Sequence, residues 1–116
     1  MRNIFVHSLE GEQAWIRHLA RAGIDEAEWR QVGHCDQEFK DVEAMRKHME
    51  EVEAEDRAYL EKLQPGDLDK RFLVPWCEAS QKRFRVEDVL MHVVEEMIHH
   101  TGELICLMWQ IDIEPP

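Results

Sequence analysis

The sequence has few positive charges and no long apolar run. Its 116 residues include 14 Lys or Arg against 25 Asp or Glu, which gives a formal net charge of −11. A nucleic-acid backbone or an anionic membrane surface would repel such a chain, so we exclude both as main partners. No stretch reaches the ~18 apolar residues that a membrane span needs, and the first residues lack the apolar run of a secretory signal.

Cysteines are also few. Cys35, Cys77 and Cys106 are odd in number and far apart, which excludes a disulfide framework and a cysteine-rich zinc knuckle. We therefore predict a reduced, cytoplasmic protein. Hydrophobic residues make up 44% of the chain, which is enough for a core, and the length favours a single domain over residues 1–116.

Three long segments carry apolar residues at helical spacing. The first helix is expected over residues 3–21. The second follows an N-cap at Asp36 and continues to about residue 64, with the acidic run over residues 50–55 as a solvated face. The third is expected over residues 87–111. Because it is apolar nearly all round, it is predicted to be the central, most buried helix.

Two shorter segments complete the predicted fold. Residues 25–31 indicate a short helical turn. Residues 67–85 are irregular and rich in β-branched and aromatic residues, so they predict short extended pieces or a small hairpin, which Pro75 limits to an edge or a bend. The predicted fold class is therefore an all-α bundle with a short irregular insert.

Polar side chains interrupt the last helix on one face. His92, Glu96 and His100 are spaced i, i+4, i+8, and Glu103 follows on nearly the same face. Burying such groups costs several kcal/mol unless something compensates them. They either hydrogen-bond one another and nearby cations, or bind a metal ion.

A divalent cation explains these residue types well. Imidazole nitrogen and carboxylate oxygen suit Zn²⁺, Fe²⁺, Ni²⁺ or Mn²⁺, and an i, i+4 pair places two ligands on adjacent turns. A third ligand must come from another helix, and His7 is the candidate. Three protein ligands leave an open position for water, as in catalytic sites. His18, His34 and His48 are predicted to lie on the surface.

The run VLMHVVEEMIHHTGELICLMWQIDIEPP over residues 89–116 resembles the end of the DinB-like family of metal-dependent four-helix bundles. The N-terminal run IFVHSLEGEQAWI over residues 4–16 is similar to that family's second helix, and the segment around Val74-Pro75-Trp76 is similar to its linker. The resemblance implies an up-down bundle of three long helices and a short one. It is an incomplete four-helix bundle, because family members usually begin with one more helix.

This resemblance implies metal ligands at His7, Glu96 and His100, the same trio that the spacing indicates. Two positions depart from the family pattern. Glu96 stands where the middle ligand is usually His, which favours a harder ion, and Thr101 replaces an Arg that follows the last ligand. An apolar groove is expected where the family's first helix would lie, so we predict a homodimer in which each subunit covers the other's groove.

Relatives in the wider family imply an activity. They resemble thiol transferases, in which the metal binds a low-molecular-weight thiol such as bacillithiol or mycothiol and lowers its pKa for attack on an electrophile. Glu103, His92 and His99 would then orient ligands or move protons. Three other interpretations remain open: a metal-dependent hydrolase, a di-iron site built on the Glu96-x-x-His99 spacing, and a non-catalytic acidic bundle acting in a stress response.

Overall fold

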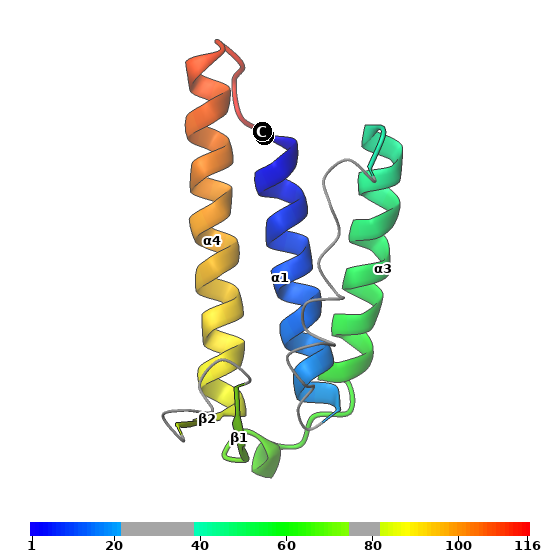
Figure 1. The fold of residues 1–116 in the computed structure, drawn as a ribbon, viewed down its shortest axis with the longest axis vertical. Coiled ribbons are helices and arrows are strands. Elements are labelled where there is room, and N and C mark those ends of the chain that lie inside the picture. The colour runs from blue at the N-terminus through cyan, green and yellow to red at the C-terminus, as the bar shows by residue number, and fades with distance from the viewer. Residues whose placement is uncertain (22–38, 75–81) are drawn as a thin grey trace.

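The computed structural model describes residues 1–21, 39–74 and 82–116. Three long helices lie side by side in it, α1 (Arg2–Ala20), α3 (Val42–Leu60) and α4 (Val86–Gln110) (Figure 1). Between α3 and α4 come a short 3₁₀-helix, η2 (Pro65–Asp67), and two strands, β1 (Arg71–Leu73) and β2 (Arg83–Arg85). The predicted all-α bundle with a hairpin-like insert is confirmed. The predicted turn over residues 25–31, the predicted cap Asp36, Pro75 and His34 lie outside the described residues.

The insert anchors the start of α4. Strands β1 and β2 pair antiparallel, with Phe72 opposite Phe84. The first backbone N–H groups of α4 then donate back to the insert: Val86 N lies 3.0 Å from Lys70 O, and Glu87 N lies 3.1 Å from Leu68 O. These bonds satisfy donors that a helix N-terminus would otherwise leave unpaired. The direction in which α4 leaves the hairpin is thereby fixed.

The central helix is α1, not the last helix as the sequence analysis predicted. α1 packs against both α3 and α4, which flank it (Figure 1). Its Ile16 and Leu19 form the core with Val86 and Val89 of α4, at the hairpin end of the bundle. Because α1 is the main long-helix neighbour of α4 among the described elements, much of the apolar surface of α4 stays exposed. An apolar composition therefore did not make α4 the most buried helix.

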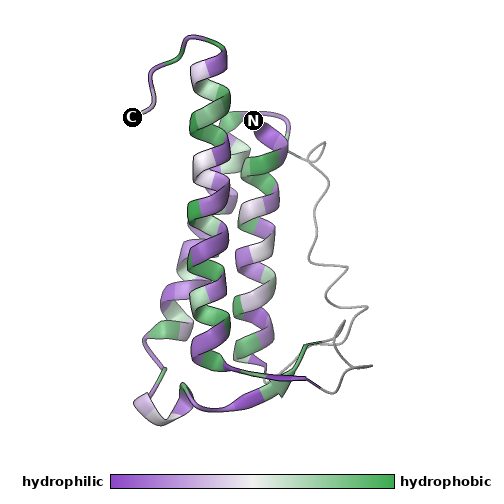
Figure 2. Cartoon of the chain, turned by 90° about the vertical axis from the view of Figure 1, so that its left-hand side faces the viewer, coloured by the Kyte–Doolittle hydropathy of each residue, from purple (hydrophilic) through white to green (hydrophobic). Residues whose placement is uncertain are grey.

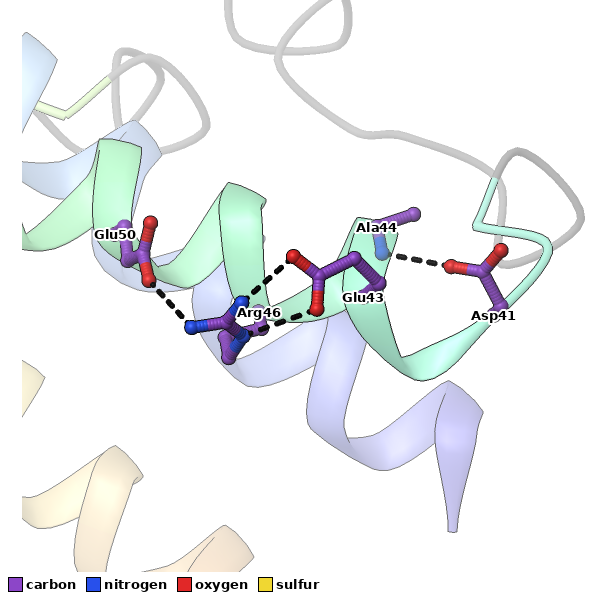
Figure 3. A network of polar contacts seen from close by, with 5 residues as sticks. All are labelled: Asp41, Glu43, Ala44, Arg46 and Glu50. Carbon is purple, nitrogen blue, oxygen red and sulfur yellow. Dashed lines mark hydrogen bonds and ion pairs between the residues drawn. The ribbon is translucent and has the colours of Figure 1, made fainter.

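Helix α3 begins later than predicted. Its N-cap is Asp41, whose Oδ1 accepts from the backbone N–H of Ala44 at 2.8 Å (Figure 3). An Asp at this position satisfies one of the unpaired donors of the first turn. On the same exposed side, Arg46 bridges Glu43 and Glu50 at 2.7 and 3.3 Å (Figure 3). The prediction that this helix already includes residues 39 and 40 was wrong, because Phe39 and Lys40 are not helical.

Two histidines predicted to lie on the surface are buried. His18 on α1 is fully buried, and its Nε2 donates to the carbonyl oxygen of Leu73 at 3.2 Å. Its ring also contacts the ring of Phe72, with centroids 4.9 Å apart. His48 on α3 is 6% exposed and lies beside the ring of Phe39. The hairpin supplies the partner that makes the burial of His18 possible, and that partner is distant in sequence.

Part of the acidic run on α3 faces α1 rather than solvent. Glu55 accepts two hydrogen bonds from Arg17, Nε to Oε2 at 2.7 Å and Nη2 to Oε1 at 2.6 Å, and a third from Gln13 at 3.0 Å. Val52, on the same side of α3, is buried. The prediction of a wholly solvated face was wrong at these positions. None of the described helices combines the length and apolar character that a membrane crossing requires.

Candidate metal centre

The three predicted ligands come together between α1 and α4. These helices run in opposite directions, so the start of α1 lies beside the later turns of α4 (Figure 1). The rings of His7 and His100 are edge to face, with centroids 5.1 Å apart. Both line a cavity of about 200 Å³, and Glu96 lines it too. The long-range pairing that the sequence indicated is therefore present in the fold.

His100 is held by carboxylates on both sides of its ring. Nδ1 lies 2.7 Å from Glu103 Oε2, and Nε2 lies 3.5 Å from Glu96 Oε2. The short contact is a charge-assisted hydrogen bond in which Nδ1–H donates to Glu103. This bond lowers the pKa of Glu103, and the charges of His99, His100 and His7 add to the effect. The other ring nitrogen, Nε2, faces Glu96, and both residues line the cavity.

The ligand types and their separations fit a divalent ion. Ligand atoms about 2.0–2.2 Å from a tetrahedral ion are roughly 3.3–3.6 Å apart, and the 3.5 Å between His100 Nε2 and Glu96 Oε2 falls in that range. A metal-bound histidine usually donates its other ring N–H to a carboxylate, as His100 does to Glu103. His7 is exposed, so its ring can turn toward the other two groups at little cost.

A second set of side chains shares His100. His99, His100 and Glu103 each offer a ligand atom within 4.8 Å of the others, and they can also hold a metal ion. Among the described residues this set is more tightly gathered than His7, Glu96 and His100. However, the side chain of His99 is 63% exposed, whereas that of His100 is 13% exposed. The first set requires His7 and the second requires His99, so substitution of each histidine can distinguish the two sets.

The remaining residues predicted at the site have distinct surroundings. His92 lines the cavity and packs edge to face against Trp15, with centroids 5.4 Å apart. His99 contacts Glu103 at 3.6 Å and lies outside the cavity lining. The hydroxyl of Thr101, where the family pattern has Arg, donates to the carbonyl of Met97 at 2.7 Å in its own helix. Thr101 therefore adds no charge to the site.

Sequence reasoning missed one cavity residue, Glu12. Its carboxyl group lines the cavity and hydrogen-bonds the carboxyl group of Asp56 on α3. Burial, the bond to Asp56 and the charges of Asp56 and Glu53 raise the pKa of Glu12 to about 8. Burial also raises the pKa of Asp56. One signal was available: Glu12 falls between Leu9 and Ile16 at the spacing of inward-facing positions.

A larger cavity lies away from the histidines. It has a volume of about 750 Å³ and lies at the C-terminal end of α1, between α3 and the hairpin, where Ile16, Tyr59 and Phe72 contribute to its walls. Its lining includes no histidine. Size alone therefore does not identify the functional site, and the chemistry of the side chains favours the smaller cavity.

Comparison with known proteins shows the family of the chain. The family model described as the DinB family matches residues 1–116, which is the whole chain. No curated protein matches the sequence.

Proposed function

Because the chain belongs to the DinB family, we propose that it is a metal-dependent protein whose ligands are His7, Glu96 and His100. We further propose that it catalyses thiol-dependent S-transfer to a small electrophile. The observation that carries the metal site is the arrangement around His100. One ring nitrogen is bound by Glu103, while the other faces Glu96 in a cavity that His7 also lines.

The side chains of this pocket have separable roles. A bound divalent ion would lower the pKa of a thiol, so that the thiolate would be available near neutral pH. Glu103 orients His100, and His99 in turn contacts Glu103. His92, at the edge of the cavity, is placed to accept a proton from a thiol. The carboxyl group of Glu12 has a pKa of about 8, so it is protonated near neutral pH and can donate this proton within the same cavity.

The presence of His92 and Glu12 in one cavity also favours a second candidate, a metal-dependent hydrolase. An acceptor and a donor of protons line one cavity with the proposed ligands, and activation of water requires the same two functions. The two candidates differ in whether a thiol binds. They share the metal site, so the metal is tested first.

Metal content of the protein purified without a nickel column tests the site. We expect about one ion per chain, as in mononuclear catalytic sites, and its loss in His7→Ala and in His100→Ala. The matched control is His99→Ala, which should keep the ion. Loss of the ion in His99→Ala with retention in His7→Ala would assign the site to His99, His100 and Glu103 instead. Two irons per site would favour a di-iron centre. If wild type binds no metal ion even when metal is added, the interpretation as a non-catalytic bundle remains.

Thiol binding then separates the two activities. Bacillithiol or mycothiol should raise the melting temperature of the metal-loaded protein, because a ligand that binds only the folded state stabilises it. The same thiols should leave the melting temperature of His100→Ala unchanged. If no thiol shifts the melting temperature of the metal-loaded protein, the hydrolase interpretation replaces the transferase.

A further inference from the structure

The side of α4 that faces away from α1 carries a line of large apolar side chains. We call this line the α4 seam. Its members are 38–67% exposed and are Met91, Val94, Ile98, Ile105 and Trp109. Figure 2 views the molecule from the α4 side and shows hydrophobic bands repeating along this helix. Contiguous apolar surface of this kind on a polar protein marks a contact with a partner.

The seam has the spacing of a helix that packs against another helix. Its first four members follow one another at intervals of three, four and seven residues, which is the a/d pattern of a coiled coil with one position left for Thr101. α1 occupies a different side of α4, where Val86, Val89 and Val93 are buried. A groove of about 530 Å³ runs beside the seam, lined by residues that include Met97, Thr101 and Gly102.

The seam is complementary to itself when two copies run antiparallel. Ile98 lies midway between Met91 and Ile105, seven residues from each. About a twofold axis at Ile98, each Met91 therefore meets the other copy's Ile105, and each Val94 lies across from Gly102, next to Thr101. The small residues Thr101 and Gly102 leave room for Val94, and a Cβ placed on Gly102 would meet nothing within 4 Å.

Most acidic side chains of α4 are paired within the chain, which leaves little charge beside the seam for a basic partner. Four of the five acidic side chains of α4 already have a partner in their own chain. Glu87 and Asp88 lie 2.6 and 3.1 Å from Arg85, and Glu96 and Glu103 contact His100. The fifth, Glu95, borders the seam. In an antiparallel pair about Ile98 it lies across from Thr101 of the second copy, so no second carboxylate faces it.

We propose that the protein forms an antiparallel homodimer through the α4 seam, with Ile98 at the twofold axis. The inference rests on exposed side chains and their spacing, and it is independent of metal binding and of the proposed activity.

Sedimentation equilibrium of the full chain over the micromolar range tests the proposal. We expect wild type to dimerise and Ile98→Glu to weaken the dimer at least tenfold, since the two new carboxylates would face each other at the axis. Leu60→Glu is the matched control, because Leu60 is an exposed apolar residue of α3 outside the seam. Circular dichroism should show equal helix content in all three. A monomeric wild type, or a dimer that Ile98→Glu leaves intact, refutes the proposal.

Cross-linking tests the orientation. When Val94→Cys and Thr101→Cys proteins are mixed and oxidised, peptide mapping should find the bond between positions 94 and 101 in preference to a bond between two copies of position 94. A preference for the latter contradicts the antiparallel arrangement. Added salt should leave the dimer as strong or stronger, because it screens the repulsion between two acidic chains. A wild type that stays monomeric and binds an amphipathic Leu/Lys peptide, with binding weakened by salt, would assign the seam to a basic partner instead.

Discussion

Single residues in this protein show how burial changes the chemistry of ordinary side chains. Glu12 and Asp56 come from different helices and share a proton in a partly buried contact. His18 is enclosed between α1 and the hairpin. In both cases the folded state prefers the neutral form, so the stability of the fold depends on pH, with opposite signs for the acid and the base.

For Glu12, stability should fall as the pH rises. The pKa of Glu12 is about 8 in the folded protein, whereas it is 4.5 in the unfolded chain. The folded state therefore binds more protons between these values, and the free energy of unfolding decreases across that window. Glu12→Gln removes the ionisation. In chelator-treated protein we expect it to be more stable than wild type by about 1–2 kcal/mol at pH 9, a value discounted for solvent screening.

Denaturant unfolding at pH 5 and pH 9 measures this difference. At pH 5 the two proteins should have nearly equal stability, because Glu12 is then protonated in the folded state. Glu50→Gln, at an exposed position of α3, serves as the control. An advantage of Glu12→Gln that is the same at both pH values would show that Glu12 is not the group that titrates.

For His18, stability should fall as the pH drops. Burial lowers the pKa of its imidazole, although the bond to the Leu73 carbonyl opposes the shift. The unfolded chain gains this proton near pH 6.5, before the folded protein does, so the stability present above pH 6.5 is lost as the pH falls below it. His18→Phe should flatten this loss. It should also cost about 1–3 kcal/mol at pH 7.5, because the Leu73 carbonyl loses its donor.

Thermal unfolding between pH 5 and pH 7.5 follows the effect. His99→Ala removes an exposed imidazole and should retain the acid dependence of wild type. If His18→Phe and wild type lose stability in parallel on acidification, a different histidine is responsible, and His48 becomes the next candidate because it is also buried.

At the scale of elements, the contact between α1 and α3 depends on Glu55. Its carboxylate is half-buried and accepts three hydrogen bonds from α1, whereas Glu50 makes one ion pair of 3.3 Å within α3 (Figure 3). Bidentate pairs with arginine are stronger than single exposed pairs. We expect Glu55→Ala to lower the free energy of unfolding by about 1–2 kcal/mol, and Glu50→Ala by less than about 0.5 kcal/mol. Equal losses in urea titrations would show that the interhelical pair adds no stability.

The bounds of two long helices could be predicted from the sequence, whereas the elements that pack against each helix could not. Helical periodicity located α1 and α4 to within one residue at each end, because the pattern is a property of the segment. The prediction that α4 is the most buried helix was wrong, because a helix that is apolar all round still needs enough neighbours to cover it. His18 was placed on the surface because its acceptor, Leu73, belongs to a hairpin 55 residues away.

In the candidate site, too, contacts within one helix could be predicted from spacing, whereas contacts between distant segments could not. Glu96 and His100 lie on one helix face, so their spacing was sufficient to predict that they meet. His7 is far away in sequence, and its proximity to His100 followed from the need for a ligand on a second helix and from the family resemblance. Glu12 was missed because its partner Asp56 lies on α3, and no local pattern connects the two residues.

At the scale of the whole molecule, the proposed ligands join the first described helix to the last. An ion bound by His7, Glu96 and His100 would tie α1 to α4 and should stabilise the entire fold. At a free metal concentration 100 times the dissociation constant, linkage gives about 2.7 kcal/mol, which corresponds to a rise of roughly 10 °C in melting temperature. Chelation should reverse the rise, and His100→Ala should show none. A melting temperature of wild type that is insensitive to both metal and chelator contradicts the site.

The central position of α1 also has a consequence for synthesis on the ribosome. α1 is made before its two neighbours, and the neighbour that completes the core, α4, emerges after α3. Until then the Ile16 and Leu19 side of α1 has only part of its final cover. Such transiently uncovered apolar surface is where growing chains associate wrongly, so the nascent protein should depend on chaperones most strongly just before α4 is released.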